Sequence, residues 1–264
     1  MRITYRTRDN KEYWTSRWAD IPADNPMENH TVYPLKYAEL IVHDTDGQIL
    51  EAGCGAGRIL RYYHERGYNI IGIDFIKIAI DKLKQIDPTL KVEVGDITNL
   101  RFHDGAFKYV LAFGLYHNFD FAGAKRAVAE THRVLKTGGL VCASFRADNI
   151  QTRITDWMAE RTKKRGGQRK EANVFHKMNL SRNEFERLFS QARFDVQNLY
   201  PVENMPFLYK FEFFRSTGHQ RFDENKARVE GYRLSWFGQR LQNILMRFFP
   251  NQFCNIYVLI ARKV

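Results

Sequence analysis

Three glycines and one acidic residue stand close together in the stretch Ile-Leu-Glu-Ala-Gly-Cys-Gly-Ala-Gly-Arg, residues 49–58. Gly53, Gly55 and Gly57 occupy alternate positions between an apolar run and a stretch of helical character. A turn this tight needs residues without a Cβ, because they reach unusual φ and ψ values and let a ligand touch the backbone. The helix that follows offers free N–H groups and a positive dipole end, so the stretch predicts a site for a polar or anionic ligand.

Three nucleotide-binding patterns compete for these glycines. A phosphate-binding P-loop needs Gly-Lys and then Ser or Thr after its second glycine, and this stretch does not supply them. The dinucleotide fingerprint needs a glycine at the sixth position counted from Gly53, where this sequence has Arg58. A bulky cation there would obstruct the close packing of helix and strand. The third pattern, an acidic residue followed by x-G-x-G-x-G, is matched without a gap from Glu51 onward.

This third pattern resembles the cofactor loop of class I S-adenosylmethionine (SAM) methyltransferases, in which Gly-Cys-Gly is a frequent form. The strand-like runs that follow end in residues of the kinds that this family uses. They are residues 68–73 before Asp74 and Phe75, residues 90–94 before Gly95 and Asp96, and residues 106–113 before the segment Gly114 to Asn118. The glycine loop and these three strand ends occur in the family's order. Together they favour this interpretation over a nucleotide-binding fold whose strand ends carry acids by chance.

The resemblance implies SAM as the cofactor, S-adenosylhomocysteine as its product, and no metal. It implies that Asp74 accepts hydrogen bonds from both ribose hydroxyls. It also implies that Asp96 takes the adenine amino group while the backbone of the next residue meets the ring. The cofactor-binding residues expected on this basis are Glu51, Gly53, Cys54, Gly55, Gly57, Asp74, Phe75, Asp96, Ile97 and Phe113.

The loop after the fourth strand faces the transferred methyl group in this family, which makes its side chains candidates for catalysis. A methyl group on a sulfonium is already electrophilic, so the enzyme must mainly align an acceptor atom and exclude water. Where the acceptor is a hydroxyl, a base helps, and the pKa of a histidine suits that role. His117 is the best-placed base, although it could instead only orient the substrate. Tyr116 and His176 are the further catalytic candidates.

Aromatic residues near the N-terminus are the candidates for substrate contact. Tyr13, Trp14 and Trp18 share one face of a helix expected over residues 11–19. A similar Tyr-Trp…Arg-Trp segment folds over the cofactor in many small-molecule methyltransferases; the alternative is a helix packed on the sheet. Tyr33 is a fourth candidate for the substrate site. We therefore expect residues 1–45 to form a helical lid and residues 46–264 to form the SAM-binding domain.

Strand-like and helix-like runs alternate from residue 48 to residue 146, which predicts an α/β fold with a parallel sheet and right-handed crossovers. Helices are expected over residues 58–66, 76–86 and 121–135, with the pair Gly138-Gly139 ending the last of them. Further strands are expected over residues 140–145, 194–203 and 253–262. The resemblance implies a Rossmann-like seven-stranded, mostly parallel sheet. Its order is 3-2-1-4-5-7-6, with helices on both faces and an insertion between strands six and seven.

The net charge of +11 is concentrated in the second half of the chain. Residues 151–264 hold 21 Lys and Arg against 11 Asp and Glu, or +10, whereas residues 1–150 hold 20 against 19, or +1. This asymmetry predicts an anionic partner, surface or substrate on the second half. Residues 156–177 are expected to form a basic, solvated loop; the functional alternative is a loop that captures phosphate or carboxylate groups.

The insertion, residues 204–252, has an amphipathic pattern over residues 232–249. Apolar residues fall at helical spacing: Leu234, Phe237, Leu241, Ile244, Leu245 and Phe248. Arg233, Arg240 and Arg247 recur every seven residues. A helix of this kind either packs on the core and covers the acceptor, or lies on an anionic membrane surface. We expect the packed arrangement, with the apolar stripe buried.

Other features restrict the compartment and the class of protein. No run approaches the roughly 18 apolar residues of a membrane span, and the N-terminus lacks the apolar region of a signal peptide. Cys54, Cys142 and Cys254 are odd in number and far apart, which predicts reduced thiols in a cytoplasmic protein.

The function expected from these features is methyl transfer to an O or N atom of a small-molecule or lipid-linked acceptor. An anionic acceptor is one option, and peripheral contact to an anionic membrane surface is a further one. One alternative is an RNA or other macromolecular methyltransferase, whose nucleic-acid binding would weaken steeply with salt. A third is a non-catalytic SAM-binding partner module.

Overall fold

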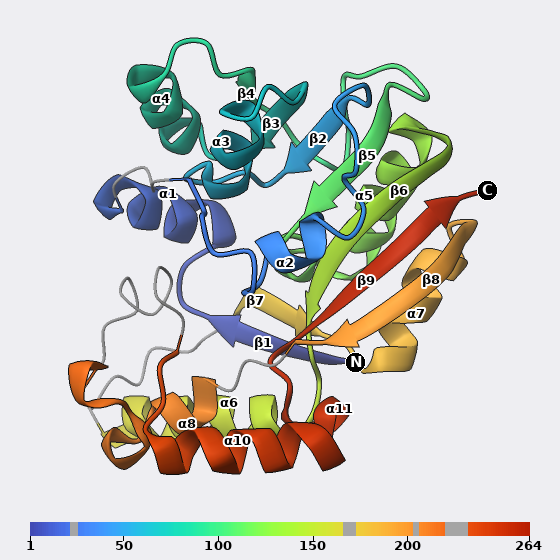
Figure 1. Ribbon diagram of the computed structural model, residues 1–264. Coiled ribbons are helices and arrows are strands. Elements are labelled where there is room, and N and C mark those ends of the chain that lie inside the picture. The colour runs from blue at the N-terminus through green and yellow to red at the C-terminus, as the bar shows by residue number, and fades with distance from the viewer. Residues whose placement is uncertain (22–25, 166–172, 203–205, 220–231) are drawn as a thin grey trace.

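The computed structural model describes residues 1–21, 26–165, 173–202, 206–219 and 232–264 (Figure 1). Its centre is a seven-stranded sheet in the order β4-β3-β2-β5-β6-β9-β8. The strands are β2 (Ile49–Ala52), β3 (Ile70–Asp74), β4 (Val92–Val94), β5 (Phe107–Ala112), β6 (Leu135–Arg146), β8 (Phe194–Pro201) and β9 (Ile256–Lys263). Numbered one to seven along the chain, these strands have the expected order 3-2-1-4-5-7-6, and β9 runs antiparallel to both of its neighbours. The predicted fold class is confirmed.

Helices cover both faces of this sheet. They are α5 (Phe121–Val134) and α7 (Arg182–Ser190) on one face, and α2 (Leu35–Ala38), α3 (Arg58–His64) and α4 (Lys77–Ile86) on the other. Neighbouring residues of β5 point to opposite faces, so that Val110 belongs to the first core and Leu111 to the second. Burial on both faces is why the parallel strands read as continuous apolar runs. The helices predicted between strands one and five are confirmed to within two residues at each end.

The prediction that Gly138-Gly139 ends the last of these helices is wrong. α5 ends at Val134 and is capped by Leu135, and both glycines lie inside β6. A Cβ on Gly139 would stand 2.8 Å from the carbonyl oxygen of Lys136 and 2.9 Å from that of Lys108. Gly139 therefore allows close approach of neighbouring backbones rather than helix termination.

The prediction of a basic loop over residues 156–177 is also wrong for most of its length. Residues up to 165 belong to a helix, α6 (Ile150–Arg165), and the end of the range lies in β7 (Val174–Asn179). Residues 166–172, which include part of the basic run, lie outside the described residues. A run of Lys and Arg with few glycines is compatible with a helix, because long charged side chains lose little rotamer freedom there.

The first 45 residues are not entirely helical. α1 (Asn10–Asp20) and α2 are present, but β1 (Arg2–Arg6) precedes them and pairs antiparallel with β7 in a separate two-stranded sheet. In Figure 1 this small sheet lies beneath α1, between the main sheet and the lower helices. Pairing partners more than 160 residues apart leave no local signal in the sequence, so this sheet was not predicted.

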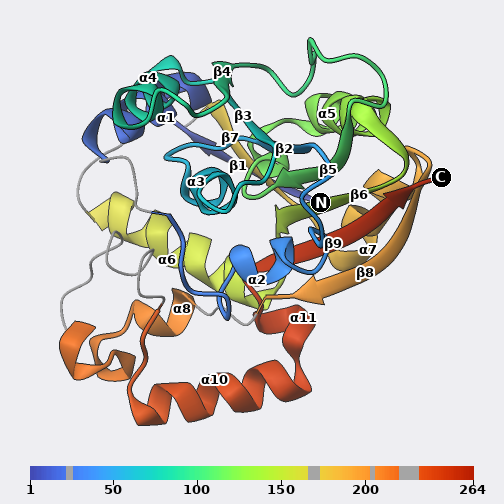
Figure 2. The ribbon, with the colours of Figure 1, turned by 45° about the horizontal axis from the view of Figure 1, so that its top comes forward.

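The insertion between strands six and seven is helical where it is described. It contains α8 (Pro206–Tyr209), the 3₁₀ turns η2 (Glu212–Phe214) and η3 (Thr217–His219), α10 (Trp236–Phe248) and α11 (Pro250–Phe253). Residues 204, 205 and 220–231 of the predicted insertion lie outside the described residues. Figures 1 and 2 show α6, α8 and α10 together at the end of the molecule opposite α4. Among the described residues no helix is long and apolar enough to cross a membrane.

Candidate functional site

A pocket of about 570 Å³ lies at the carboxyl ends of the central strands. This is where ligands bind in open α/β sheets. Nine of the ten predicted cofactor residues line it: Glu51, Gly53, Cys54, Gly55, Asp74, Phe75, Asp96, Ile97 and Phe113. The tenth, Gly57, is the N-cap of α3. The strand ends thus bring together residues that the sequence separates by more than 60 positions.

The glycine loop follows β2 as a tight turn of left-handed residues. Gly53, Gly55 and Gly57 have φ values of +74°, +53° and +80°, which side chains with a Cβ rarely adopt. The N–H groups of Gly53 and Cys54 donate to the carbonyl oxygen of Ile73 at 2.8 and 2.9 Å. These bonds hold the loop against the end of β3, so that its backbone faces the pocket.

Glu51 is a buried acid beside this loop. Its Oε2 has no hydrogen-bond partner among the described residues. Burial raises the pKa of Glu51 to about 8, and the N–H of Leu60 and the charge of Arg58 oppose that rise. A buried acceptor without a donor costs free energy, and a ligand with an ammonium group could donate a hydrogen bond to it. The residues present therefore fit the SAM that the resemblance implies.

Asp74 stands at the tip of β3 and is held there by two backbone donors. Its Oδ2 accepts from the N–H of Gly55 at 2.9 Å, and its Oδ1 accepts from the N–H of Ile76 at 2.9 Å. Burial raises its pKa. Each carboxylate oxygen keeps a second lone pair that can accept from a ribose hydroxyl.

Asp96 is fixed in a comparable way after β4. Its Oδ1 accepts from both the N–H and the hydroxyl of Thr98 at 2.8 Å. The carboxylate therefore has a fixed orientation at the rim of the pocket, next to Ile97.

The N-terminal helix α1 packs over the glycine loop, in the position expected of a lid. Trp14 and Trp18 line the pocket and stack with their ring centroids 5.8 Å apart. The Trp18 ring is so close that a Cβ on Gly55 would meet it at 2.6 Å. Lys82 of α4 donates to the carbonyl oxygens of Trp18 and of two following residues at 2.7–2.9 Å, which anchors the end of α1.

Tyr13 is not among the pocket-lining residues. Its ring lies under the guanidinium of Arg6, 4.0 Å from the ring centroid, so it supports α1.

Tyr33 lines the pocket as predicted and belongs to a polar chain that the sequence analysis missed. Its hydroxyl lies 2.9 Å from Ser144 Oγ, which also accepts from the N–H of Gly114 at 2.8 Å. Burial raises the pKa of Tyr33 to about 12, so the phenol stays neutral near pH 7. A lone hydroxyl in the apolar run 140–145 was the signal that could have identified Ser144.

Tyr116 does not reach the pocket, which removes it from the catalytic candidates. The short 3₁₀ turn η1 (Tyr116–Asn118) directs its ring into the core, where its hydroxyl bonds to Thr131 at 2.7 Å. It packs edge-to-face on Phe189 and is fully buried. The residue types in this loop did not reveal which way each side chain would turn.

His117 and His176 lie outside the pocket lining. Burial, followed by the charges of Lys177 and Arg146, holds the pKa of His117 well below its usual range. Its Nδ1 has no partner among the described residues. A neutral, weakly basic imidazole that does not line the pocket is poorly suited to act as a general base. His176 on β7 has its Nδ1 3.4 Å from Thr4 Oγ1 of β1.

Asn118 is a pocket residue that the sequence analysis did not single out. Its Nδ2 donates to the carbonyl oxygens of Gly114 and Leu115 at 2.8 and 3.1 Å. Its Oδ1 is buried without a donor among the described residues. Asn10 of α1 donates to the Asn118 carbonyl oxygen at 2.7 Å, which links α1 to this loop. Asn118 therefore presents a fixed acceptor to an N–H or O–H group of a ligand.

Cationic side chains gather beside the pocket. Burial, followed by the charges of Arg146, Arg6 and Arg17, lowers the pKa of Lys177 to about 8, while the charge of Asp156 opposes this change. Arg17 lines the pocket, so the cluster adjoins it.

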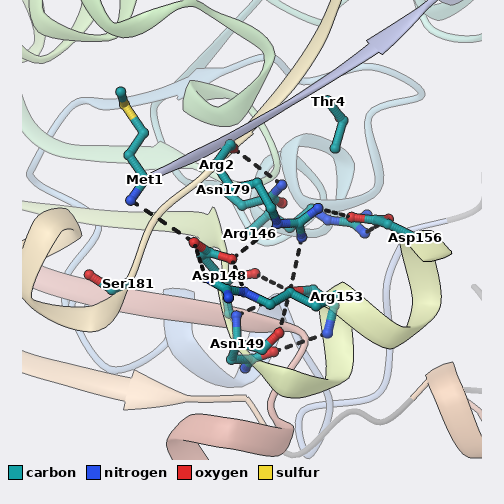
Figure 3. Close-up of polar contacts among 12 residues, drawn as sticks. Met1, Arg2, Thr4, Arg146, Asp148, Asn149, Arg153, Asp156, Asn179 and Ser181 are labelled. Atoms are coloured by element: carbon teal, nitrogen blue, oxygen red, sulfur yellow. Dashed lines mark hydrogen bonds and ion pairs between the residues drawn. The ribbon is translucent and has the colours of Figure 1, made fainter.

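Asp156 is already shared between two arginines (Figure 3). Its Oδ1 accepts from Arg146 at 2.7 Å and its Oδ2 accepts from Arg2 at 2.7 Å. Within the described ranges, no group of three His, Cys, Asp or Glu side chains is placed to hold a metal ion.

Known proteins resemble part of this chain in sequence. Residues 49–139 match the family described as "Methyltransferase domain". A demethylmenaquinone methyltransferase of Renibacterium salmoninarum is 33% identical over 100 residues, which are 37% of this chain and 41% of that protein. An S-adenosyl-L-methionine-dependent Diels-Alderase of Talaromyces variabilis is 27% identical over 139 residues, which are 48% of this chain and 44% of that protein. The matches span less than half the length of these curated relatives.

The fold is shared more widely. A SAM-dependent methyltransferase of Methanosarcina mazei superposes with a TM-score of 0.57 at 16% identity, over 88% of this chain and 98% of that chain.

Proposed function

We propose, since the chain belongs to the class I SAM-dependent methyltransferases, that it transfers a methyl group from SAM to an O or N atom of an anionic small-molecule or lipid-linked acceptor. Bound SAM supplies a methyl group on a positively charged sulfur. Glu51 would hold a cationic part of it, Asp74 the ribose and Asp96 the adenine. The orphaned Oε2 of Glu51 and the left-handed glycine loop support this assignment.

The observation that carries the choice of acceptor is the cation cluster beside the pocket. The charges of Arg146, Arg6 and Arg17 each lower the pKa of Lys177, and the nearby carboxylate of Asp156 is already bonded to Arg146 and Arg2. Positive charges that lie close together repel one another and destabilise the folded state. A phosphate or carboxylate on the acceptor would relieve that repulsion, so the cluster favours an anionic acceptor over a neutral one.

The remaining pocket residues would orient the acceptor and exclude water. Asn118 offers a fixed acceptor atom through Oδ1, and Tyr33 offers a neutral hydroxyl held by Ser144. Trp14 and Trp18 of α1 cover the side of the pocket that the glycine loop forms. Alignment and removal of water can account for much of the rate of methyl transfer. This proposal therefore needs no strong base, in agreement with the position of His117.

The acceptor class can be tested with methyl-labelled SAM and cell extract separated by anion exchange. We expect label to enter the anionic fractions. Lys177→Met should reduce that labelling about 10- to 100-fold, because the cluster loses one of the positive charges that attract an anionic acceptor. Binding of S-adenosylhomocysteine should change little, because Lys177 does not line the cofactor pocket.

Lys125→Met is the matched control, since Lys125 is an exposed lysine over Phe121 on α5. This variant should transfer as much label to the acceptor as the unchanged protein does. Label confined to neutral or cationic fractions would contradict the anionic acceptor. Label that disappears after ribonuclease treatment would instead support RNA methylation.

A further inference from the structure

We propose that the outer face of α10 docks the protein on an anionic membrane surface. This inference is independent of the methyl-transfer reaction. It concerns six side chains, which we call the α10 face: Trp236, Phe237, Arg240, Ile244, Arg247 and Phe248. Their spacing of i, i+1, i+4, i+8, i+11 and i+12 places them on one side of the helix.

The α10 face is exposed, contrary to the expectation of a buried stripe. Trp236 is 72% exposed and Phe248 66%, and Phe237 and Ile244 are each more than half exposed. The helix packs inward through other residues, chiefly Gly238 and Met246. The apolar residues expected at helical spacing thus divide between two faces, and half of the predicted stripe points to solvent.

Aromatic residues beside the helix extend this surface. Phe213 of η2 is exposed and its ring lies 5.8 Å from that of Phe237, and Phe249 follows the helix end and is exposed too. Phe237 in turn stacks on Phe214, 6.0 Å away, which fixes its orientation. Exposed apolar groups of this size, gathered over one helix, mark an interaction site rather than ordinary surface.

Charge identifies the kind of partner. Arg240 lies 4.7 Å from the ring centroid of Trp236, and Arg247 lies 6.0 Å from that of Phe248, so each cation is interleaved with an aromatic ring. From Tyr232 to Val264 the sequence has five Lys or Arg and no Asp or Glu. Trp, Phe and Arg on one face match the boundary between acyl chains and acidic headgroups, where rings insert and guanidinium groups reach the phosphates.

The position of α10 permits such contact. In both ribbon views the helix runs along an edge of the molecule, with no described segment outside it (Figures 1 and 2). The helix could insert this face among the headgroups while the main sheet stays in water. A protein partner would be expected to supply acidic residues between the aromatic rings, and a second copy of this face would bring arginines against arginines.

Co-sedimentation with lipid vesicles tests the proposal. The protein should bind vesicles of phosphatidylcholine with about 30% phosphatidylserine and not vesicles of phosphatidylcholine alone. Binding should fall when salt is raised from about 0.1 M to about 1 M. The double variant Arg240→Glu and Arg247→Glu should bind at least about tenfold more weakly. Emission from Trp236 should shift to the blue on binding, and that shift should be absent in Trp236→Phe.

The matched control carries the same charge change on α5, as Lys125→Glu with Arg126→Glu, and should bind vesicles with nearly unchanged affinity. Both residues are exposed, as are Arg240 and Arg247, so all of these variants should fold. Thermal unfolding measures whether they do. If both double variants lose vesicle binding equally, binding depends only on the net charge of the protein, and the proposal is overturned. Failure to bind anionic vesicles, or a concentration-dependent dimer that Trp236→Ser abolishes, would also overturn it.

Discussion

Replacing Glu51 by Gln should stabilise the protein without cofactor at pH 8 and above, while it weakens binding of SAM. The folded-state pKa of Glu51 is about 8, against a usual value of 4.5. Because the folded pKa is the higher one, the stability that this group contributes is complete below about pH 4.5 and is lost as the pH rises through about 8. Above that pH the folded protein carries a buried carboxylate that the unfolded chain keeps in water.

Glutamine removes this penalty and can still accept from the N–H of Leu60. A difference of about 3.5 pKa units corresponds to roughly 5 kcal/mol, so the variant should gain stability of that order at about pH 9 and little at about pH 4. Loss of the carboxylate should weaken binding of SAM by about 10- to 100-fold. Denaturant unfolding between pH 4 and 9, with calorimetric titration of SAM, measures both effects.

Glu186→Gln is a suitable control, because Glu186 is exposed on α7. Its unfolding curve should run parallel to that of the unchanged protein across the pH range. If the Glu51→Gln curve is also parallel, the carboxyl group is already solvated in the folded state, and its assignment to a cationic ligand group fails.

Replacing Gly55 by Val should abolish measurable cofactor binding, a loss of at least about 100-fold. Gly55 has a φ of +53°, and a Cβ there would stand 2.6 Å from the Trp18 ring. Valine would both strain the loop and push α1 away from the pocket. The N–H of Gly55 that donates to Asp74 would shift with it, so the ribose acid would lose its support.

Gly67→Val separates backbone strain from crowding. Gly67 follows α3 with a φ of +79°, but a Cβ there would meet nothing within 4 Å. Both variants should lose about 1–2 kcal/mol of stability from the left-handed backbone, whereas the Gly67 variant should keep its cofactor affinity. Calorimetric titration of each variant measures that affinity. Similar affinities for the two variants would mean that the glycine loop does not contact the ligand.

The parts of the fold that could be predicted are those with local signals. Each of these signals occupies only a few consecutive residues: the glycine loop, an acid at the end of a strand, or one apolar run. The parallel sheet and most of its pocket could therefore be predicted from the sequence. The capping box formed by Ser181 and Glu184 at the start of α7 is a local signal of the same kind, and both of its hydrogen bonds are present.

The failures are those where tertiary contacts decide. β1 forms because β7 is available to pair with it, and α6 forms where a basic composition suggested a loop. Tyr116 and Asn118 are only two positions apart, yet the 3₁₀ turn directs the Tyr116 side chain into the core and places Asn118 at the pocket.

The apolar residues of α10 had a pattern that predicts a helix, but the pattern did not indicate which side would be covered. Periodicity indicates that the two faces of a helix differ in polarity. It does not indicate which face packs against the rest of the protein.

Calorimetric titration with S-adenosylhomocysteine, and separately with NAD⁺, tests the central claim that this pocket binds the methyl donor. Glu51, Asp74 and the three glycines predict saturable binding of S-adenosylhomocysteine to a single site. No heat is expected from NAD⁺, because Arg58 occupies the position where a dinucleotide site needs its third glycine. Binding of NAD⁺ together with no response to S-adenosylhomocysteine would contradict the account.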